Sequence, residues 1–427
     1  MSERTDPLNM ERTTLSSGLE VVLQAAPASA HSFSVSYVAP AGWGFEPRGT
    51  GGLAMVAAKL SVGMPGKRSR EELARTLDRL GASLSSAVAP ESAELTLWGP
   101  DDSWNPLLEI FADAIFRPHF DPEELARAQR QLRERQLRQL VQPDFRAARE
   151  LMSGLFPAGH PYHSTGLGNP VSAARISIEG LQRFHRSHFP AKGSVLAVTS
   201  RAPRHVVIGS LERYFPSSEF GPDPPLPSLS GNALRPHRLD ISIRGQSQVA
   251  IRIGAPTGSR SDPLYPELFL VNEVLGGRPL LSRLFQRIRE QQGLAYHASS
   301  ELEAMRWGGY WEAVAGTDPA TRDRVVRLMV GEVERLSSDL IPPSELDRIR
   351  ESALGSLPLE LETTASAHEL AVDVAYHRLS GDFYRSWPAQ LRGLRPKQLR
   401  AAAEVGFRAD RTMVVTAGPP SKRVSSR

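Results

Sequence analysis

The sequence predicts an α+β fold of two similar lobes, each an antiparallel sheet with helices on one face, which together form a half-clamshell. Three observations predict this fold. The chain has 427 residues, more than one ordinary hydrophobic core requires. Segments with alternating polar and apolar residues, such as 32–38, are interleaved with amphipathic helical segments, such as 71–80. The second half of the chain also repeats the order of these signals.

The repeat is clearest in the segment that ends each half. Residues 181–200 read LQRFHRSHFPAKGSVLAVTS, and residues 399–418 read LRAAAEVGFRADRTMVVTAG. Both consist of a helical pattern, an aromatic residue at Phe189 or Phe407, a polar turn and a strand pattern. Because a repeat this long has only two copies, it favours a duplicated lobe over a solenoid.

A segment rich in Pro, Gly and Ser separates the two halves. It spans 217–237 and has the composition of a linker between lobes. The sequence therefore predicts an N-terminal lobe at 1–216 and a C-terminal lobe at 238–427.

The composition limits the chemistry of the chain. Hydrophobic residues make up 40% and charged residues 23%, as in ordinary globular proteins. With no cysteine, disulfides, thiol nucleophiles and thiolate metal sites are excluded. No apolar run reaches the roughly 20 residues of a membrane span, and the start, MSERTDPLNMERTT, has no apolar signal core. We therefore expect a cytoplasmic protein, or a periplasmic one if a leader was removed.

A nucleic-acid partner is not expected. The net charge is only +4, and the basic residues are spread along the chain. One helical segment does carry an arginine-rich face, but aromatic residues for base stacking are missing from it. The basic residues concerned are Arg127, Arg130, Arg133, Arg135 and Arg138.

Three segments carry a resemblance to a known family. They are AGWGFEPRGTGGLAMVAAKLSVGMPGKRSREELARTLDRLGASLSS at 41–86, HPYHSTGLGNP from His160 and LGGRPLLSRLFQRIREQQGLAYHASS from Leu275. The chain resembles the pitrilysin/insulinase family of zinc peptidases, in particular its processing-peptidase branch, from about Gly18 to Gly418. This resemblance implies two α+β lobes around a chamber that admits peptides.

In active members of that family, GLA is followed by His-x-x-Glu-His. Two imidazoles at i and i+4 bind Zn²⁺, and the Glu acts as a general base. The resemblance places Met55, Ala58 and Lys59 at these three positions, and it places a third ligand at Arg135, with Glu134 adjacent. Thioether, methyl and ammonium groups cannot replace imidazoles and a carboxylate. We therefore expect no metal ligand and no catalytic residue on this chain.

Two interpretations of the altered helix remain open. Lys59 and Arg135 could act as fixed cations in the space of the missing ion, paired with Glu134. Alternatively, Met55 and Ala58 pack while the basic heads reach solvent, as long basic side chains readily do. The remaining histidines are more typical of structural positions than of ligands, among them His160, His163, His185, His188 and His368.

The motif of the C-terminal lobe is intact. An apolar stripe at i, i+3, i+4 and i+7 predicts an amphipathic helix, formed by Leu281, Leu284, Phe285 and Ile288. Gly293 ends it as a C′ glycine, placing Arg289 in the last turn and Tyr296 on the following strand. The resemblance implies that Arg289 and Tyr296 bind the substrate backbone and stabilise a developing oxyanion. The structural alternatives are helix-dipole complementarity for Arg289 and a half-buried strand aromatic for Tyr296.

These observations favour a non-catalytic, substrate-binding subunit of a heterodimeric zinc metallopeptidase. The partner would be a homologous catalytic subunit that keeps His-x-x-Glu-His and holds the zinc. Arg289 and Tyr296 would serve that partner's active site, and an extended peptide would add to an exposed strand edge, for which 82–88 is the candidate. The alternative is a peptide-binding or structural scaffold subunit without peptidase activity.

Overall fold

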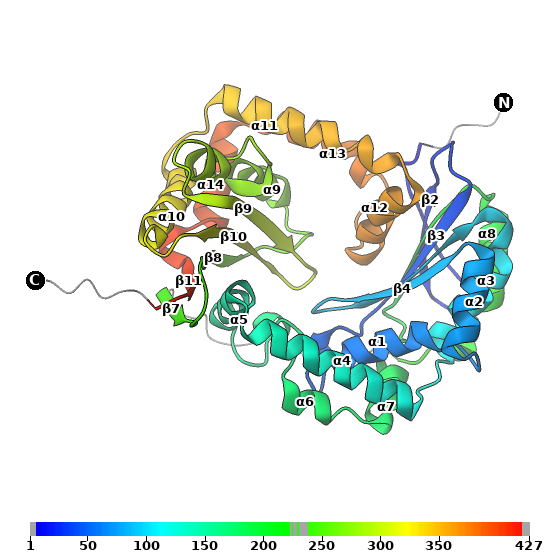
Figure 1. Ribbon diagram of the computed structural model, residues 1–427. Helices are drawn as coiled ribbons and strands as arrows, with labels where there is room; N and C mark the ends of the chain where they lie inside the picture. Colours follow the sequence, from blue (N-terminus) through cyan, green and yellow to red (C-terminus); the bar gives the residue numbers. More distant parts are fainter. Residues whose placement is uncertain (1–5, 223, 225–228, 230–237, 421–427) are drawn as a thin grey trace, which may run out of the picture. The chain divides into compact units, whose positions relative to one another are not determined.

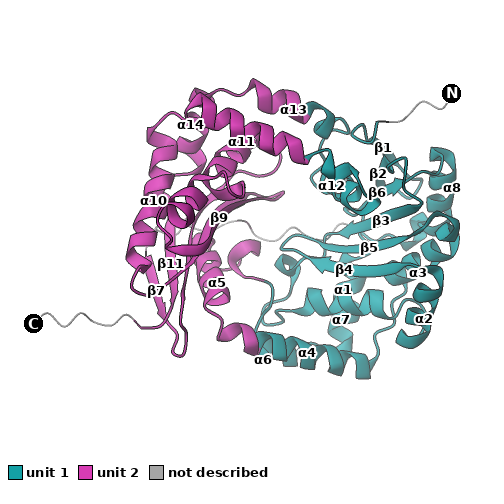
Figure 2. Ribbon diagram, turned by 45° about the horizontal axis from the view of Figure 1, so that its top comes forward, with its two compact units in different colours: residues 1–136, 166–227, 357–386 teal, residues 137–165, 228–356, 387–427 magenta. Residues whose placement is uncertain are grey.

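The computed structural model describes residues 6–222, 224, 229 and 238–420. Most of the predicted linker, 217–237, lies outside the described residues. The chain divides into two compact units, coloured separately in Figure 2. Unit 1 comprises 1–136, 166–227 and 357–386, and unit 2 comprises 137–165, 228–356 and 387–427.

Unit 1 is built on a six-stranded sheet with the order β1-β2-β6-β3-β5-β4 (Figure 1). Its central strands are buried on both faces, whereas β4 alternates between exposed and half-buried residues. The strands are β1 Glu11–Thr14, β2 Glu20–Ala25, β3 Ser32–Ala39, β4 Ser83–Val88, β5 Ala93–Pro100 and β6 Val195–Ser200.

Unit 2 is built on a five-stranded sheet with the order β7-β11-β8-β10-β9. Apart from β1, this order matches the first sheet strand for strand, which confirms the predicted duplication. The strands are β7 Arg238–Ser242, β8 Val249–Thr257, β9 Ala295–Ala304, β10 Gly309–Thr317 and β11 Met413–Gly418.

Helices surround both sheets. Those that begin in unit 1 are α1 Leu53–Gly63, α2 Arg70–Leu80, α3 Trp104–Phe116, α4 Pro122–Leu140, α6 Pro170–Ala174, α7 Ile178–His188, α8 Arg204–Tyr214, α12 Thr364–Tyr376 and α13 Phe383–Gly393. Those of unit 2 are α5 Pro143–Leu155, α9 Tyr265–Asn272, α10 Arg322–Ser338, α11 Pro343–Ser356 and α14 Pro396–Gly406. Helices α4 and α13 continue along the chain from unit 1 into unit 2.

The aromatic residues of the predicted repeat occupy equivalent places. Phe189 and Phe407 are both fully buried and both follow a helix, α7 or α14, that leads into a closing strand. In each unit, a backbone carbonyl at the end of this helix also accepts a hydrogen bond from a buried aromatic ring. Tyr37 Oη donates to Phe189 O at 2.5 Å, and Trp311 Nε1 donates to Gly406 O at 2.8 Å.

Each sheet is mixed, which refines the expected antiparallel arrangement. The pairs β2–β6 and β7–β11 are parallel, and all other pairs are antiparallel. A parallel pair requires a long crossover connection. Most of each half of the sequence lies between the two strands of its parallel pair and provides that connection.

Helices also cover both faces of the central strands, because each sheet takes one helix from the other half of the sequence. Helix α12 packs on β6, β2 and β3, opposite α3 and α8 (Figure 1). Helix α5 packs on β8 and β11. The compact units therefore differ from the predicted lobes, 1–216 and 238–427, in the two segments 137–165 and 357–386.

Buried polar contacts fix the two exchanged helices. On α12, the ring nitrogens of His368 each lie 2.9 Å from a hydroxyl of the sheet, those of Thr199 and Ser36. Burial lowers the pKa of His368 to about 3, so the ring is neutral. On α5, Asp144 pairs with Arg252 of β8 at 2.9 Å. These contacts specify where each helix docks on its sheet.

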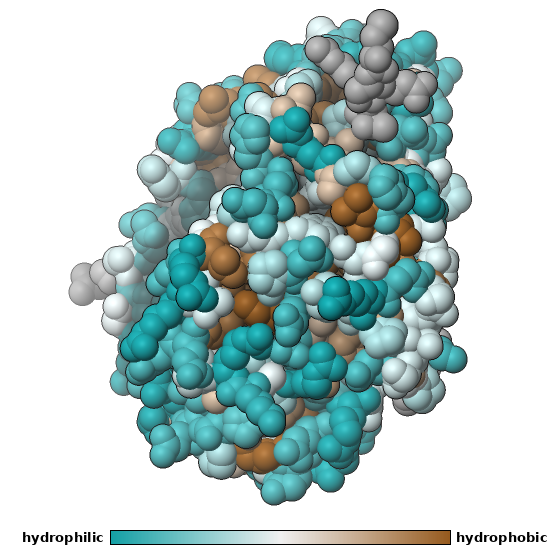
Figure 3. Space-filling model, turned by 90° about the vertical axis from the view of Figure 1, so that its right-hand side faces the viewer, coloured by the Kyte–Doolittle hydropathy of each residue, from teal (hydrophilic) through white to brown (hydrophobic). Residues whose placement is uncertain are grey.

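The surface in Figure 3 is mainly hydrophilic, with hydrophobic groups confined to separate patches. In the described part of the chain, every helix is too short or too polar to cross a bilayer.

Candidate functional site

Helix α1 carries the three altered positions, and its N-terminus is held from outside the helix. The preceding residue, Gly52, has φ of 97° and no side chain to cap the helix. The Glu46 carboxyl group takes this role, accepting hydrogen bonds from Ala54 N at 2.8 Å and Gly52 N at 3.1 Å. Burial raises the pKa of Glu46 to about 8, although these N–H groups lower it. The helix position is thus retained by contacts that involve no metal.

A cavity of about 370 Å³ lies where α1, α4 and β4 meet. Its lining combines apolar groups, two cations and one strand edge: Met55, Val56, Lys59, Ser86, Ala87, Val88, Ala128, Gln131, Leu132 and Arg135. Arg135 lines this cavity, whereas Glu134 does not. Ala58 is fully buried and is not part of the lining.

The structure answers the question about Lys59 and Arg135 in part. Lys59 Nζ donates to Gln131 Oε1 at 2.5 Å, and Arg135 Nη1 lies 3.7 Å from Met55 Sδ. Neither cation pairs with Glu134, which is exposed. Both cations contact neutral groups, so the ion pair included in one of the two interpretations is not formed.

The residues of this cavity do not fit a zinc ion. They supply no imidazole and no carboxylate, and two of them are cations that repel a divalent ion. Nowhere among the described residues do three or more His, Cys, Asp or Glu gather as a metal would require.

The histidines considered as ligands have structural partners instead. His160 accepts from Tyr162 N at 3.1 Å, and His163 and His188 contact backbone carbonyls of Phe156 and Pro40. Burial lowers the pKa of His185 to about 4. The interpretation of these residues as structural histidines stays a prediction.

Strand β4 forms one edge of the first sheet, as expected for the candidate peptide-binding edge at 82–88. Among the described strands, it pairs with β5 alone, from Ser83 opposite Trp98 to Val88 opposite Ala93. Three consecutive residues of β4 line the cavity. Since successive side chains of a strand point to opposite faces, a cavity that meets all three lies along the edge of the strand.

In unit 2, the predicted helix before Gly293 ends as a π-helix, η6 Phe285–Glu290. Gly293 has φ of 60°, and its N–H donates to Arg289 O at 3.0 Å, as expected for a C′ glycine. The Arg289 guanidinium lies 5.0 Å from the Phe285 ring centre and 4.9 Å from that of Tyr296. The structure therefore brings the two predicted site residues together.

The exposure of Tyr296 excludes one of the structural alternatives. Its side chain is 79% exposed, so it is not a half-buried strand aromatic. Phe285 is the residue that sequence reasoning missed, since it was assigned only to the apolar stripe. Its spacing of i, i+4 from Arg289 was the available signal.

Backbone contact fixes this motif against β9. The preceding π-helix, η5 Glu273–Gly277, packs on β9, and a Cβ at Gly276 would lie 2.3 Å from Ser300 N. Ser300 Oγ also donates to Asn272 Oδ1 at 2.8 Å. Glycine is required at 276 for this approach, which explains the first glycine of the GG pair.

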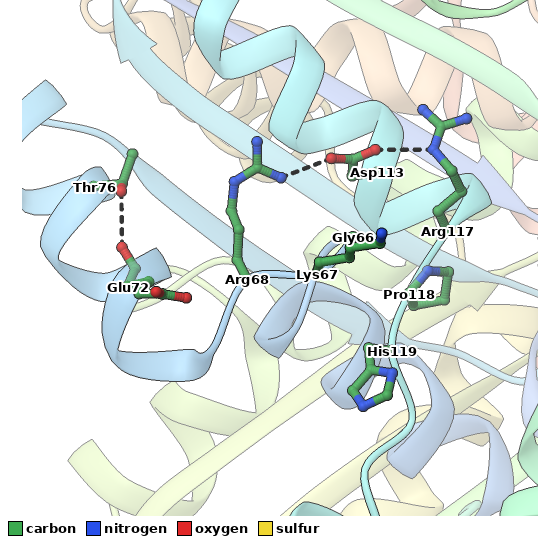
Figure 4. Close-up of a pocket in the computed structure, with 9 residues that line it drawn as sticks. All are labelled: Gly66, Lys67, Arg68, Glu72, Thr76, Asp113, Arg117, Pro118 and His119. Carbon is green, nitrogen blue, oxygen red and sulfur yellow. Dashed lines mark hydrogen bonds and ion pairs between the residues drawn. The ribbon is translucent and has the colours of Figure 1, made fainter.

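A second cavity in unit 1 differs in charge balance from the cavity between α1, α4 and β4. It measures about 900 Å³ and is bounded by Arg68, Asp113 and Arg117, among other residues (Figure 4). The Asp113 carboxylate accepts from Arg68 at 2.6 Å and from Arg117 at 3.0 Å. Both guanidinium groups are thus paired with an acid, unlike the cations beside β4.

Comparison with known proteins identifies the family. Residues 20–153 match the model of insulinase, peptidase family M16, and residues 175–353 match the peptidase M16 inactive domain. Two models of one family together match more than half of the chain. The chain belongs to peptidase family M16. The resemblance seen in the sequence is confirmed.

Relatives and solved structures agree with this assignment. An uncharacterized zinc protease of Mycobacterium tuberculosis is 26% identical over 357 residues, which cover 83% of this chain and 81% of that protein. The peptidase M16 inactive domain of Pseudomonas fluorescens has a TM-score of 0.89 at 22% identity, covering 96% of this chain and 98% of its own. A protease from Helicobacter pylori has a TM-score of 0.84 at 17% identity, with coverages of 96% and 99%. Both structures share the fold of this M16 chain.

Proposed function

We propose that this M16 chain is the non-catalytic, substrate-binding subunit of a heterodimeric zinc peptidase. Its partner is a homologous chain that keeps His-x-x-Glu-His and holds the zinc. The contrast between the two units supports this proposal, because the metal-binding positions are replaced while the Arg289 and Tyr296 pair is assembled. A scaffold without substrate would need neither residue at the surface.

The observation that carries the proposal is the arrangement of Tyr296. A ring that is 79% exposed contributes little to the core, yet its face contacts the Arg289 guanidinium. Cation–π contacts with Phe285 and Tyr296 restrict the rotamers of Arg289. The guanidinium and phenol are then oriented donors before a substrate arrives.

Such donors act on the substrate carbonyl. A guanidinium N–H and a phenol O–H can both donate to a carbonyl oxygen as it gains negative charge. The peptide itself would be held by its main chain along the edge of β4, where the strand pairs on one side only. This chain would therefore bind and orient the peptide, and the partner would supply the hydrolytic chemistry.

The experiment combines this chain with a homologous subunit containing His-x-x-Glu-His and measures peptide turnover. Replacing Arg289 by Ala, or Tyr296 by Phe, should lower kcat by about 100-fold without separating the subunits on size exclusion. Arg327→Ala is the matched control, because Arg327 is an exposed arginine of α10 in the same unit.

Two outcomes would contradict the proposal. Unchanged turnover in both variants would leave Arg289 and Tyr296 with structural roles and would favour a scaffold. Chelator-sensitive hydrolysis by this chain alone would make it a catalyst.

A further inference from the structure

The cavity between α1, α4 and β4 has an unbalanced charge. Its lining holds two cations, Lys59 and Arg135, and no acidic residue. The contacts of both are with neutral groups, the Gln131 amide oxygen and the Met55 sulfur. Within the described residues, neither cation has an acidic partner, whereas the arginines of the cavity in Figure 4 share Asp113.

The guanidinium of Arg135 is the less satisfied of the two. A thioether is a weak acceptor, and a guanidinium has five N–H donors in a planar fork. A carboxylate matches that fork with two parallel hydrogen bonds. Next to it, the Lys59 ammonium adds a second positive charge, so an anion at this point would relieve the repulsion between the cations.

Apolar side chains line the same cavity, among them Val56, Val88, Ala128 and Leu132. They can contact the hydrocarbon part of a ligand, while the exposed heads of Lys59 and Arg135 form with its carboxylate an ion pair that salt partly screens. The volume of about 370 Å³ is at the lower end for ligand pockets and suits one side chain or a chain end.

The strand edge indicates what kind of molecule brings the anion. Ser86, Ala87 and Val88 give the cavity a stretch of strand edge, to which an extended peptide can pair by its main chain. Alternate side chains of that peptide would point to opposite faces. One acidic side chain, or the terminal carboxylate of a peptide that ends there, would then reach the two cations.

We propose that this cavity is a carboxylate-binding pocket, in which Lys59 and Arg135 select peptides that present an acidic side chain or a free C-terminus beside β4. The replacement of zinc ligands has thus reversed the charge of the ligand that the site binds. This inference rests on the proposed function insofar as the chain binds peptides.

The test measures binding of labelled peptides to the purified full-length chain by fluorescence anisotropy. Four peptides of one sequence differ only in charge: an internal Glu or Gln, each with a free C-terminus or a C-terminal amide. A carboxylate should tighten binding by about 10- to 100-fold, and the gain should decrease as salt is added. Comparing the Glu and terminal-carboxylate peptides distinguishes the two sources of the anion.

Variants then assign the effect to the cavity. Lys59→Met and Arg135→Gln should each remove most of the preference for acidic peptides. The controls are Lys192→Met, an exposed lysine in the turn before β6, and Arg130→Gln, an exposed arginine of α4 outside the cavity lining. Because all four side chains are exposed, the variants should fold, which thermal melting would verify.

The outcomes separate this inference from the proposed function. Equal affinity for all four peptides, or an acidic preference that survives both cavity variants, would overturn the pocket and leave the peptide-binding subunit intact. An acidic preference lost in the cavity variants, combined with normal turnover of Arg289→Ala, would support the pocket and overturn the catalytic contribution. Failure to bind any of the four peptides would contradict both the pocket and the proposed substrate-binding function.

Discussion

The two sheets have the same strand order but differ in what lies at the corresponding edge strands, β4 and β9. Beside β4, the lining of the cavity contains a thioether, a lysine and an arginine where the family resemblance places metal ligands. On β9, Tyr296 contacts Arg289, and these are the two residues to which the family resemblance assigns substrate binding. The two units therefore share a buried framework, whereas the exposed side chains beside their edge strands differ.

The largest change is expected from restoring ligands beside β4. Met55→His and Lys59→His place two imidazoles at i and i+4, and Arg135→Glu adds a carboxylate to the same cavity. The triple variant should retain about one zinc ion per chain, measured by mass spectrometry of the dialysed protein. The unaltered chain should retain none.

A double variant that keeps Arg135 serves as the control and should bind zinc more weakly. Stoichiometric zinc in the unaltered chain would show that the replaced residues beside β4 have not abolished metal binding.

The second expectation concerns the neutral His368 beneath the first sheet. Its folded pKa, about 3, is below the usual 6.5, so the unfolded chain binds a proton that the folded chain does not. The neutral His368 ring makes its full contribution to the free energy of unfolding above pH 6.5, and this contribution is lost as pH falls toward 3. From pH 6.5 to 4, the stability advantage over His368→Gln should shrink by about 1.4 kcal/mol per pH unit.

Urea unfolding at several pH values would measure this. His31→Gln changes an exposed histidine and is the control, with an expected pH dependence like that of the unaltered chain. If the difference in the free energy of unfolding between the unaltered chain and His368→Gln did not vary from pH 6.5 to 4, the ring would be protonated in the folded state.

The sequence predicted the class of fold, the duplication and the motif in unit 2, because these depend on local periodicity and short motifs. Examples are the helix that carries Met55 and the equivalent positions of Phe189 and Phe407 in the repeat. The exchange of α5 and α12 could not be predicted, since an amphipathic pattern indicates that a face is buried without indicating against which sheet. His368 shows the difficulty, because its partners Thr199 and Ser36 are more than 150 residues away in the chain.

The sequence predicted the residues of the candidate site but not the cavity that they line. The family pattern located Met55, Lys59, Arg135, Arg289 and Tyr296, but not the size or the full lining of the cavity beside β4. Side chains that meet from α1 and α4 leave no periodic signal, so the unpaired charges became visible only in three dimensions.

A third expectation concerns the close approach of η5 to β9. Gly276→Ala should lower the free energy of unfolding by about 1–3 kcal/mol, because the new Cβ meets the Ser300 backbone, which cannot rotate away. Gly355→Ala in α11 is the matched control. No atom lies within 4 Å of its added Cβ, so it should be neutral or stabilise by up to about 1 kcal/mol. Equal effects of both changes would show that η5 does not depend on this contact.

The smallest effect is expected from Tyr296→Ala on stability. The ring is largely exposed, and loss of its contact with Arg289 should cost less than about 1 kcal/mol. Chemical denaturation would measure the change. A loss of several kcal/mol would show that Tyr296 stabilises the fold of unit 2.

The exchange of α5 and α12 also affects how this protein can be made or divided. A fragment that stops at the middle of the chain would contain the whole first sheet but not α12, leaving the apolar side of β6 open to water and to other chains. During synthesis, that surface stays uncovered until residue 376 has left the ribosome, when almost all of the polypeptide has been made. A chaperone that binds exposed apolar strands would have its target during this interval.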